Sequence, residues 1–336
     1  MLLTIKEVAK KANVSTATVS RVLNNNYPVS EKLRLKVLEA VRELNYQPND
    51  IARSLKTKKT HMIGIVVSDI TNPYFMQIAK GVESIVISKG YNLVFCSTNE
   101  NSSREIELLR LLNEKRVDAI ILATCQKDGS YIKQLIGQGL PVILVDRKIS
   151  GCENVDTIIG DDFSASYNIV NYLISRGHKK ISILNGLLNI STGEERFKGF
   201  KKALEDNDIP IVEKYILKGH FQRDYAYRAV KTMIMEQKSD LPTAIFAANN
   251  FMAEGAMIAI YEQGLSIPEN ISLVSFGNLT VPQLVKPRLT VVSQNPYVIG
   301  QESGKLVLER INGKRDNYRK FVMSLKMQEG DSVNSI

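Results

Sequence analysis

The chain has 336 residues, of which 44% are hydrophobic and 24% are charged, and this balance excludes a mainly disordered protein. Its net charge of +9 is concentrated at the N-terminus, because residues 1–60 carry twelve Lys and Arg against five Asp and Glu. A basic segment this compact is typical of a protein that binds the phosphate backbone of nucleic acid, although a solvated basic face without a partner has the same composition.

Residues 1–46 are predicted to form one small domain of three helices. Thr4 and Glu7 form a capping box before a helix that ends at Asn13, and Ser15 and Ser30 can cap a second and a third helix. Apolar residues recur at helical spacing, so the helices share one core. In the second and third helices the inward residues are predicted to be Val19, Val22, Leu23, Leu33, Val37, Leu38, Val41 and Leu44.

The second helix leaves a face of small polar side chains pointing outward. Its members are Thr16, Ala17, Thr18, Ser20, Arg21 and Asn24. Short side chains let a helix approach the major groove of DNA closely, and an arginine can bond a guanine edge through two hydrogen bonds. A three-helix packing module with a solvated second helix is the alternative.

The stretch TIKEVAKKANVSTATVSRVLNN, which begins at Thr4, resembles the helix-turn-helix of the LacI/GalR family of bacterial repressors. The shared pattern A-x-x-x-x-V-S-x-x-T-V-S-R-V runs from Ala9 to Val22. The resemblance implies that residues 1–46 bind double-stranded operator DNA. It implies contacts from Thr4 and Ser15 as well as from the outer face of the second helix.

Residues 47–60 are expected to be a hinge linker. Pro48 ends the third helix, and Asn49 can cap a segment of about two turns, which is too short to be helical alone in water. The resemblance implies that two such segments pair in the minor groove of the operator, with contacts from Asn49, Ala52 and Leu55, and that Leu55 wedges between base pairs. A basic linker without structure is the alternative.

From residue 61 to about 330, short β-branched runs alternate with amphipathic helical stretches. The runs lie at 63–67, 92–95, 119–122, 142–145, 181–184, 244–247 and 271–274. This alternation predicts two parallel sheets covered by helices on both faces, with a small-molecule site in the cleft between them. We expect one subdomain over about 61–160 and 291–320, and a second over about 161–290 and 321–330.

This body resembles the periplasmic-binding-protein-like core of LacI/GalR regulators. The matching motifs are Asn72-Pro-Tyr-Phe75, Gly177-His178, Arg196-Phe-Lys-Gly-Phe200, Asn249 and the strand at 271–276. The resemblance implies a cleft that binds a small effector, such as a sugar, a sugar acid or a sugar phosphate. Carried over to this sequence, the effector-binding residues are Tyr74, Phe75, Asp146, Arg147, Arg196, Phe221, Asn249 and Asn278.

Two positions depart from the family pattern. The chain has Phe276-Gly277-Asn278 where an aromatic residue followed by Asp is usual, and Asn249-Asn250 where Asn-Asp is usual. The first change removes a carboxylate that would bond the ligand. Either Asn278 takes its place, or the ligand carries a negative charge that a carboxylate would repel, which favours a sugar acid or sugar phosphate.

Motifs for catalysis and cofactors are weak in this sequence. Gly137-Gln-Gly139 lacks the third glycine of a dinucleotide loop, and the stretch from Gly300 lacks a Ser or Thr after Lys305. The histidines have no metal-ligand spacing, and no G-x-S-x-G elbow is present. Cys96, Cys125 and Cys152 are too far apart for a zinc or redox motif, so we expect reduced thiols. We therefore expect no enzyme, no cofactor and no metal.

The sequence thus predicts a cytoplasmic regulator, a repressor with a helix-turn-helix head and a small-molecule-binding core. No apolar run approaches the roughly 18 residues that span a bilayer, so we expect no membrane partner. We expect a homodimer, because one small head buries too little surface for tight specific binding. Control by a purine or by a phosphoprotein corepressor is the alternative. A solute-binding module is a further one, but the basic head contradicts it.

Overall fold

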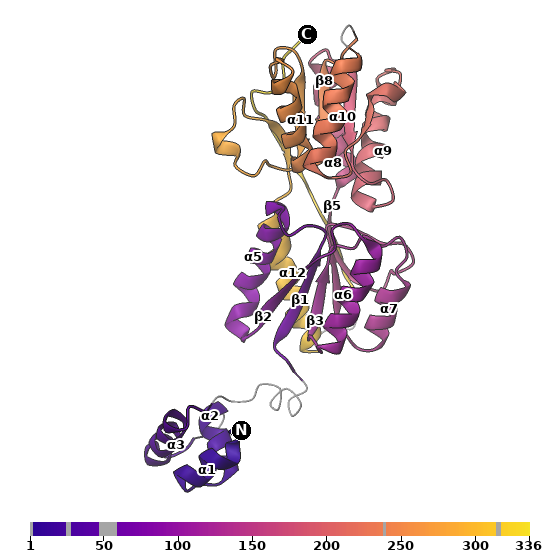
Figure 1. The fold of residues 1–336 in the computed structure, drawn as a ribbon. Coiled ribbons are helices and arrows are strands. Elements are labelled where there is room, and N and C mark those ends of the chain that lie inside the picture. The colour runs from indigo at the N-terminus through magenta and orange to yellow at the C-terminus, as the bar shows by residue number, and fades with distance from the viewer. Residues whose placement is uncertain (1–2, 25–27, 47–58, 238–239, 314–316) are drawn as a thin grey trace. The chain divides into compact units, whose positions relative to one another are not determined.

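The structure is a computed structural model that describes residues 3–24, 28–46, 59–237, 240–313 and 317–336, with the backbone alone at Asn24. The chain divides into two compact units, residues 1–60 and 61–336 (Figure 1). Among the described residues, no helix is both long and apolar enough to cross a membrane.

The first unit contains α1 (Ile5–Ala12), α2 (Thr16–Asn24) and α3 (Glu31–Glu43). The N–H of Thr4 donates to Glu7 Oε2 at 2.6 Å, and the N–H of Thr18 donates to Ser15 Oγ at 3.1 Å. These bonds satisfy backbone groups that the first turns of α1 and α2 leave unpaired. Both predicted helix starts are therefore confirmed.

The core of this unit is smaller than the sequence predicted. Val19 and Val37 are buried, and Val41 and Leu44 pack against them. Leu33 and Leu38, which were predicted to point inward, are exposed. The buried face of α3 begins at Val37 and continues at Ala40, so Leu33 lies one turn before the core and Leu38 lies beside the inward face. That part of the prediction was wrong.

The second unit holds two six-stranded sheets. The first has the strand order β11-β5-β4-β3-β1-β2, and its strands are β1 (Met62–Val67), β2 (Asn92–Ser97), β3 (Ala119–Leu122), β4 (Val142–Val145), β5 (Asp156–Gly160) and β11 (Lys320–Met323). The second has the order β12-β10-β9-β8-β6-β7, and its strands are β6 (Ile181–Asn185), β7 (Ile216–Lys218), β8 (Ala244–Ala247), β9 (Ser272–Phe276), β10 (Thr290–Ser293) and β12 (Lys326–Gln328). Neighbouring strands are parallel except for β12, which pairs antiparallel with β10.

Helices cover both faces of each sheet. The first sheet carries α5 (Pro73–Val86) and α12 (Pro296–Ile311) on one face and α6 (Ser102–Glu114) and α7 (Ser130–Gly137) on the other. The second carries α10 (Arg223–Glu236) and α11 (Asn250–Glu262) on one face and α8 (Asp162–Ser175) and α9 (Ser191–Asp206) on the other. Short 3-10 turns lie at Ile87–Lys89 (η1), Glu213–Tyr215 (η2) and Pro282–Leu284 (η3). Burial on both faces explains why the central strands are continuous apolar runs.

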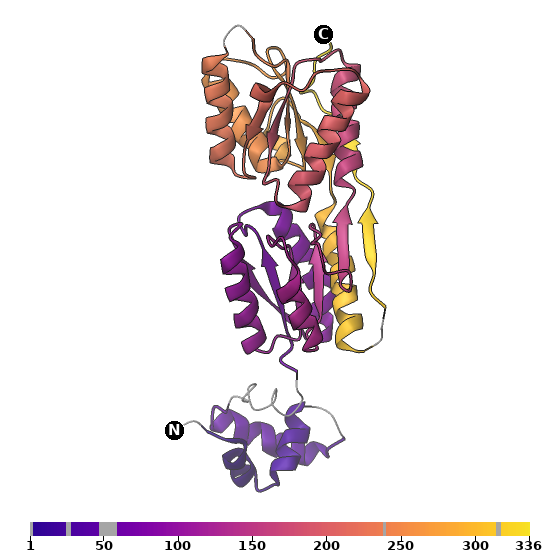
Figure 2. The same cartoon turned by 90° about the vertical axis from the view of Figure 1, so that its right-hand side faces the viewer.

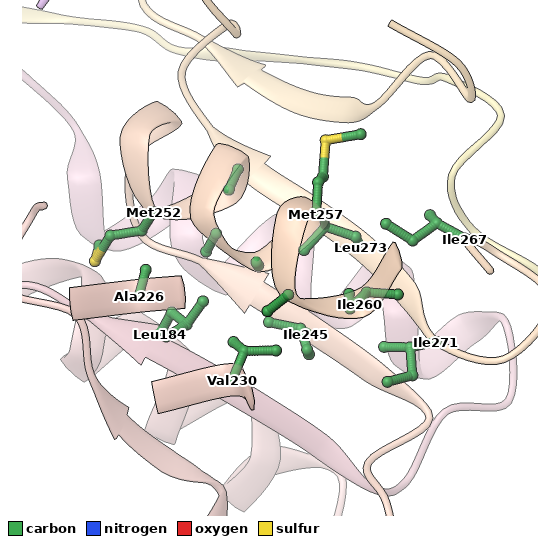
Figure 3. Packing of buried hydrophobic residues seen from close by; sticks show 14 of the residues in the cluster. Leu184, Ala226, Val230, Ile245, Met252, Met257, Ile260, Ile267, Ile271 and Leu273 are labelled. Carbon is green, nitrogen blue, oxygen red and sulfur yellow. The ribbon is translucent and has the colours of Figure 1, made fainter. Parts of the chain in front are cut away.

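The apolar cluster between the second sheet and α10 and α11 shows this packing (Figure 3). Leu184, Ile245 and Leu273 come from three neighbouring strands and meet Val230 of α10 and Ile260 of α11. These five side chains are buried. The cluster packs α11 against the sheet, and the N-terminus of α11 belongs to the site described below.

The chain passes between the two subdomains after β5, after β10 and after β11. β11 returns to the first sheet and pairs with β5, so these two strands lie side by side (Figure 2). β10 belongs to the second sheet and ends at Ser293, and β11 belongs to the first sheet and ends at Met323. The crossings after β10 and after β11 therefore lie three residues after the boundaries expected near 290 and 320. Strand pairing sets them, because β10 completes a ladder with β9 and β11 completes one with β5.

Two glycines let α5 and α12 approach closely. A Cβ atom added at Gly300 would lie 1.9 Å from the carbonyl oxygen of Ile78, and one added at Gly81 would lie 2.1 Å from that of Tyr297. No real side chain fits at these distances. The pair of helices is therefore packed backbone to backbone, and this contact fixes the N-terminus of α5.

Candidate functional site

A cavity of about 180 Å³ lies between the two subdomains of the second unit. It is lined by Ser68, Asp69, Asn72, Tyr74, Phe75, Asn99, Glu100, Asp146, Arg147, Thr192, Arg196, His220, Phe221, Gln222, Asn249, Asn250, Phe251 and Gln294. Most of these residues follow the carboxyl ends of parallel strands or begin the next helix. This is the edge at which open α/β sheets bind ligands.

Asp146 and Tyr74 form the wall from the first subdomain. The hydroxyl of Tyr74 donates to Asp146 Oδ1 at 2.8 Å. Burial of the phenol, together with the charge of Asp146, raises the pKa of Tyr74 well above its usual value. Tyr74 therefore stays protonated and holds the carboxylate of Asp146, whose φ of 64° lies in the strained left-handed region.

Arg147 follows Asp146 and is tied to Glu100. Its Nη1 and Nη2 donate to the two carboxylate oxygens of Glu100 at 2.8 and 2.6 Å, and Nη1 also donates to the carbonyl of Thr124 at 3.2 Å. Both side chains are largely buried. Bidentate pairs of this kind fix the guanidinium plane as well as its charge. The Cζ atom of Arg147 lies over the ring of Phe221, 5.8 Å from the ring centroid. This contact joins the two subdomains.

Arg196 of α9 is held in a similar way within the second subdomain. Its Nε donates to Asp162 Oδ1 at 2.9 Å, its Nη1 donates to the carbonyl of Ala248 at 2.7 Å, and its guanidinium lies 3.7 Å from the centroid of the Phe276 ring. Burial raises the pKa of Asp162 to about 6 against the opposing effect of Arg196, and the charge of Asp146 adds to the rise.

Two asparagines link the two subdomains at this site, and a third, Asn249, lies beside them. Asn72 caps α5 and accepts the N–H of Tyr74, while its amide exchanges two hydrogen bonds with the amide of Asn250, at 3.2 and 3.1 Å. Asn249 caps α11 through Met252 and donates to the carbonyl of Phe221 at 3.0 Å. An aspartate at 250 could accept from Asn72 but could not donate back, so this reciprocal pair needs the amide.

Seven of the eight residues expected to bind an effector line the cavity: Tyr74, Phe75, Asp146, Arg147, Arg196, Phe221 and Asn249. Asn278 does not line it. It is exposed, and its amide donates to Ser293 Oγ at 3.4 Å. The residue that fills the position opposite Gly277 is Gln294, because a Cβ added at Gly277 would lie 3.2 Å from Gln294 Oε1.

Sequence reasoning missed several cavity residues, among them Asn72, Glu100, His220 and Gln294. Their positions carry a weak signal, since each follows a strand or begins a helix of an α/β unit. His220 and Phe221 also have positive φ values of 52° and 61°. Strained backbone of this kind collects at ligand sites, but it is invisible in the sequence.

The second candidate site is the outer face of α2 in the first unit. Ser15, Thr16, Ala17 and Arg21 are exposed, Thr18 and Ser20 are half-buried, and Thr4 is exposed before α1. The predicted face therefore exists in the fold. The side chain of Asn24 and the hinge residues Asn49, Ala52 and Leu55 lie outside the described residues, as does most of the expected linker.

Comparisons with known families match both units. Residues 4–49 match the model described as bacterial regulatory proteins of the lacI family. Residues 60–328 match the model described as periplasmic binding proteins and sugar binding domain of the LacI family. Together the two models span nearly all of the chain.

Similar proteins agree with this assignment. The HTH-type transcriptional repressor PurR of Proteus mirabilis is 36% identical over 331 residues, which cover 98% of this chain and 96% of that protein. A lac repressor dimer bound to operator and the anti-inducer ONPF is 27% identical, with a TM-score of 0.86, and covers 99% of this chain and 100% of that one. A regulator from Enterococcus faecium with bound ribose is 29% identical, with a TM-score of 0.72, and covers 82% and 99%. The chain belongs to the LacI family of bacterial regulatory proteins.

Proposed function

We propose that this protein is a sequence-specific DNA-binding repressor whose affinity for its operator is set by a small effector in the cavity between the two subdomains. The observation that carries the proposal is the joint presence of an exposed polar face on α2 and a cavity lined from both subdomains in one chain. A bacterial repressor acts on DNA in the cytoplasm, and the proposal assigns no catalytic step to the cavity.

The size of the cavity supports an effector as small as a monosaccharide or a nucleobase. Its volume is about 180 Å³. A monosaccharide fits this space, and the similar E. faecium regulator was solved with bound ribose. The aromatic rings of Tyr74, Phe75 and Phe221 can cover an apolar sugar face. They would equally stack on a purine base, which is the second candidate.

The effector should change operator affinity by about 5- to 150-fold, the range that typical allosteric coupling of 1–3 kcal/mol provides. The operator is first selected from random duplexes by the full chain. Its affinity is then measured by fluorescence anisotropy with and without a panel of monosaccharides and nucleobases. A chain that selects no duplex sequence would contradict the proposed function.

Replacing Arg21 with alanine should cost about 1–3 kcal/mol on the selected operator, because the exposed guanidinium can bond one base through two hydrogen bonds. Affinity for unrelated duplexes should change far less. The same anisotropy assay on matched specific and non-specific duplexes tests this. An equal loss on both would identify Arg21 as a phosphate contact instead.

The proposed repressor is a homodimer, as the lac repressor is in its operator complex. Exposed apolar side chains gather on α11 and on the neighbouring 277–289 segment, including Ile258, Tyr261, Val281 and Leu284. Leu284 is 82% exposed on η3, and Figure 1 shows its segment projecting beside α11. A stable dimer buries such side chains against their copies in the partner subunit.

Leu284→Asp should therefore shift the protein from dimer to monomer at micromolar concentration, because a charge buried at an apolar interface is costly. Analytical ultracentrifugation measures the change. Met235→Asp on α10 is the matched control, since Met235 is also exposed but lies on a different helix. Equal effects of the two substitutions would place the interface elsewhere.

A further inference from the structure

We propose that the cavity selects uncharged ligands and that Glu100 is the residue that excludes anions. The inference rests on the proposed effector site and narrows its ligand class. The sequence offered two explanations for the lost carboxylate: Asn278 takes its place, or the ligand is negatively charged. The structure supports neither, because Asn278 lies outside the cavity and carboxylates line the cavity wall.

The first support is that Glu100 already neutralises the positive charge of Arg147. Glu100 takes both Nη atoms of its guanidinium, and the carbonyl of Thr124 takes a further N–H. The loop that carries Glu100 is set before any ligand arrives. Asn99 and Glu100 have positive φ values of 53° and 58°, and the N–H of Asn99 donates to the carbonyl of Ser68 at 2.7 Å.

The second support is that Arg196 is neutralised in the same way by Asp162, at 2.9 Å. The cavity wall therefore contains two guanidinium groups, and the carboxylates of Glu100, Asp146 and Asp69 line it while Asp162 lies behind Arg196. Carboxylates outnumber the cations. A buried anion would meet net negative charge here, and burial would remove the water that otherwise stabilises it.

The groups that remain open suit hydroxyls and amides. The carboxylate of Asp146 lines the cavity and can accept a hydrogen bond from a ligand hydroxyl. Gln222 and Gln294 add neutral amides to the wall. Glu100 differs from Asp162 in that it lines the cavity itself, so its removal would expose the charge of Arg147 to a ligand.

Inorganic phosphate is the probe, because it tests the charge of the site without knowledge of the effector. Glu100→Gln should bind phosphate at least about tenfold more tightly than the wild type, since the like charge opposing the anion is gone. Phosphorus NMR line broadening measures binding, and the unfolding temperature in phosphate is compared with that in chloride at equal ionic strength. Phosphate should stabilise the variant selectively.

Glu107→Gln is the matched control, because Glu107 makes the same charge change on the exposed face of α6. A gain of phosphate binding in both variants, or in neither, would overturn the role of Glu100. Circular dichroism establishes that Glu100→Gln is folded. If Glu100→Gln does not fold, the wild-type protein provides the test. Phosphate binding by the wild type that is lost in Arg147→Gln would overturn the inference, and a wild type that binds no phosphate supports it.

The failure of this inference is distinguishable from failure of the proposed function. Operator binding is measured on the same wild-type protein without phosphate. A chain that binds operator and also binds phosphate through Arg147 overturns the charge selection alone. A chain that selects no operator overturns the proposed function, whatever the cavity binds.

Discussion

Replacing Arg196 with alanine should lower the free energy of unfolding of the second unit by about 3–5 kcal/mol, the usual cost of breaking a buried ion pair from one side. Arg196 and Asp162 are both buried, and the substitution leaves the carboxylate of Asp162 without its cation. It also removes the donor to the carbonyl of Ala248. Urea unfolding at pH 8, followed by circular dichroism, measures the loss.

Two variants separate this mechanism from a general loss of packing. Asp162→Asn combined with Arg196→Ala should recover part of the stability, because no buried charge is then left unpaired. Arg176→Ala is the matched surface control. Its partner Glu329 is exposed, so the loss should be below about 1 kcal/mol. A double variant less stable than Arg196→Ala would contradict the ion-pair explanation.

The loss in free energy of unfolding that Arg196→Ala causes should also depend on pH. The pKa of Asp162 is about 6 in the folded wild type, above its ordinary 3.8, and it should rise further when Arg196 is gone. A group with a raised folded pKa contributes stability below its unfolded pKa and loses it as pH rises through the folded pKa. The gap between the single and double variants should therefore shrink as pH falls from 8 to 5. A constant gap would show that Asp162 is not the titrating group.

Gly300→Ala should destabilise the first subdomain by about 3 kcal/mol or more, at the upper end of overpacking costs. The added methyl would lie 1.9 Å from the carbonyl oxygen of Ile78, and backbone atoms cannot move aside as a flexible side chain can. Gly137→Ala in α7 is the matched control, because a Cβ there meets nothing within 4 Å. It should be neutral or stabilising by up to about 1 kcal/mol.

Gly300→Ala should also weaken effector binding by more than its loss of stability alone explains. The N-terminus of α5 carries Asn72, Tyr74 and Phe75, and α5 can only move away from α12 by carrying these residues with it. Calorimetry with the effector found in the operator assay tests this below the unfolding temperature. Wild-type affinity in a destabilised Gly300→Ala protein would show that the helix contact and the cavity are independent.

The order of helices and central strands could be predicted from the sequence alone. A buried parallel strand must be apolar throughout, and a helix on its face must repeat apolar residues at helical spacing, so both leave clear local patterns. The strands β5, β7, β10, β11 and β12 were missed. Edge strands such as β11 and β12 alternate or are exposed, and β7 has only three residues, so their composition does not differ from that of loops.

Tyr74, Phe75, Asp146 and Arg196 were also recognisable as cavity residues, because they belong to motifs that the family shares. Tertiary structure alone decided what those residues do to one another. Glu100 lies 47 positions before Arg147, and Asp162 lies 34 before Arg196, yet each pair shares buried hydrogen bonds. Nothing in the sequence marks Glu100 and Asp162 as the partners of these arginines. Charge is a property of the assembled site, since distance and burial set its strength, and neither can be read from the order of residues.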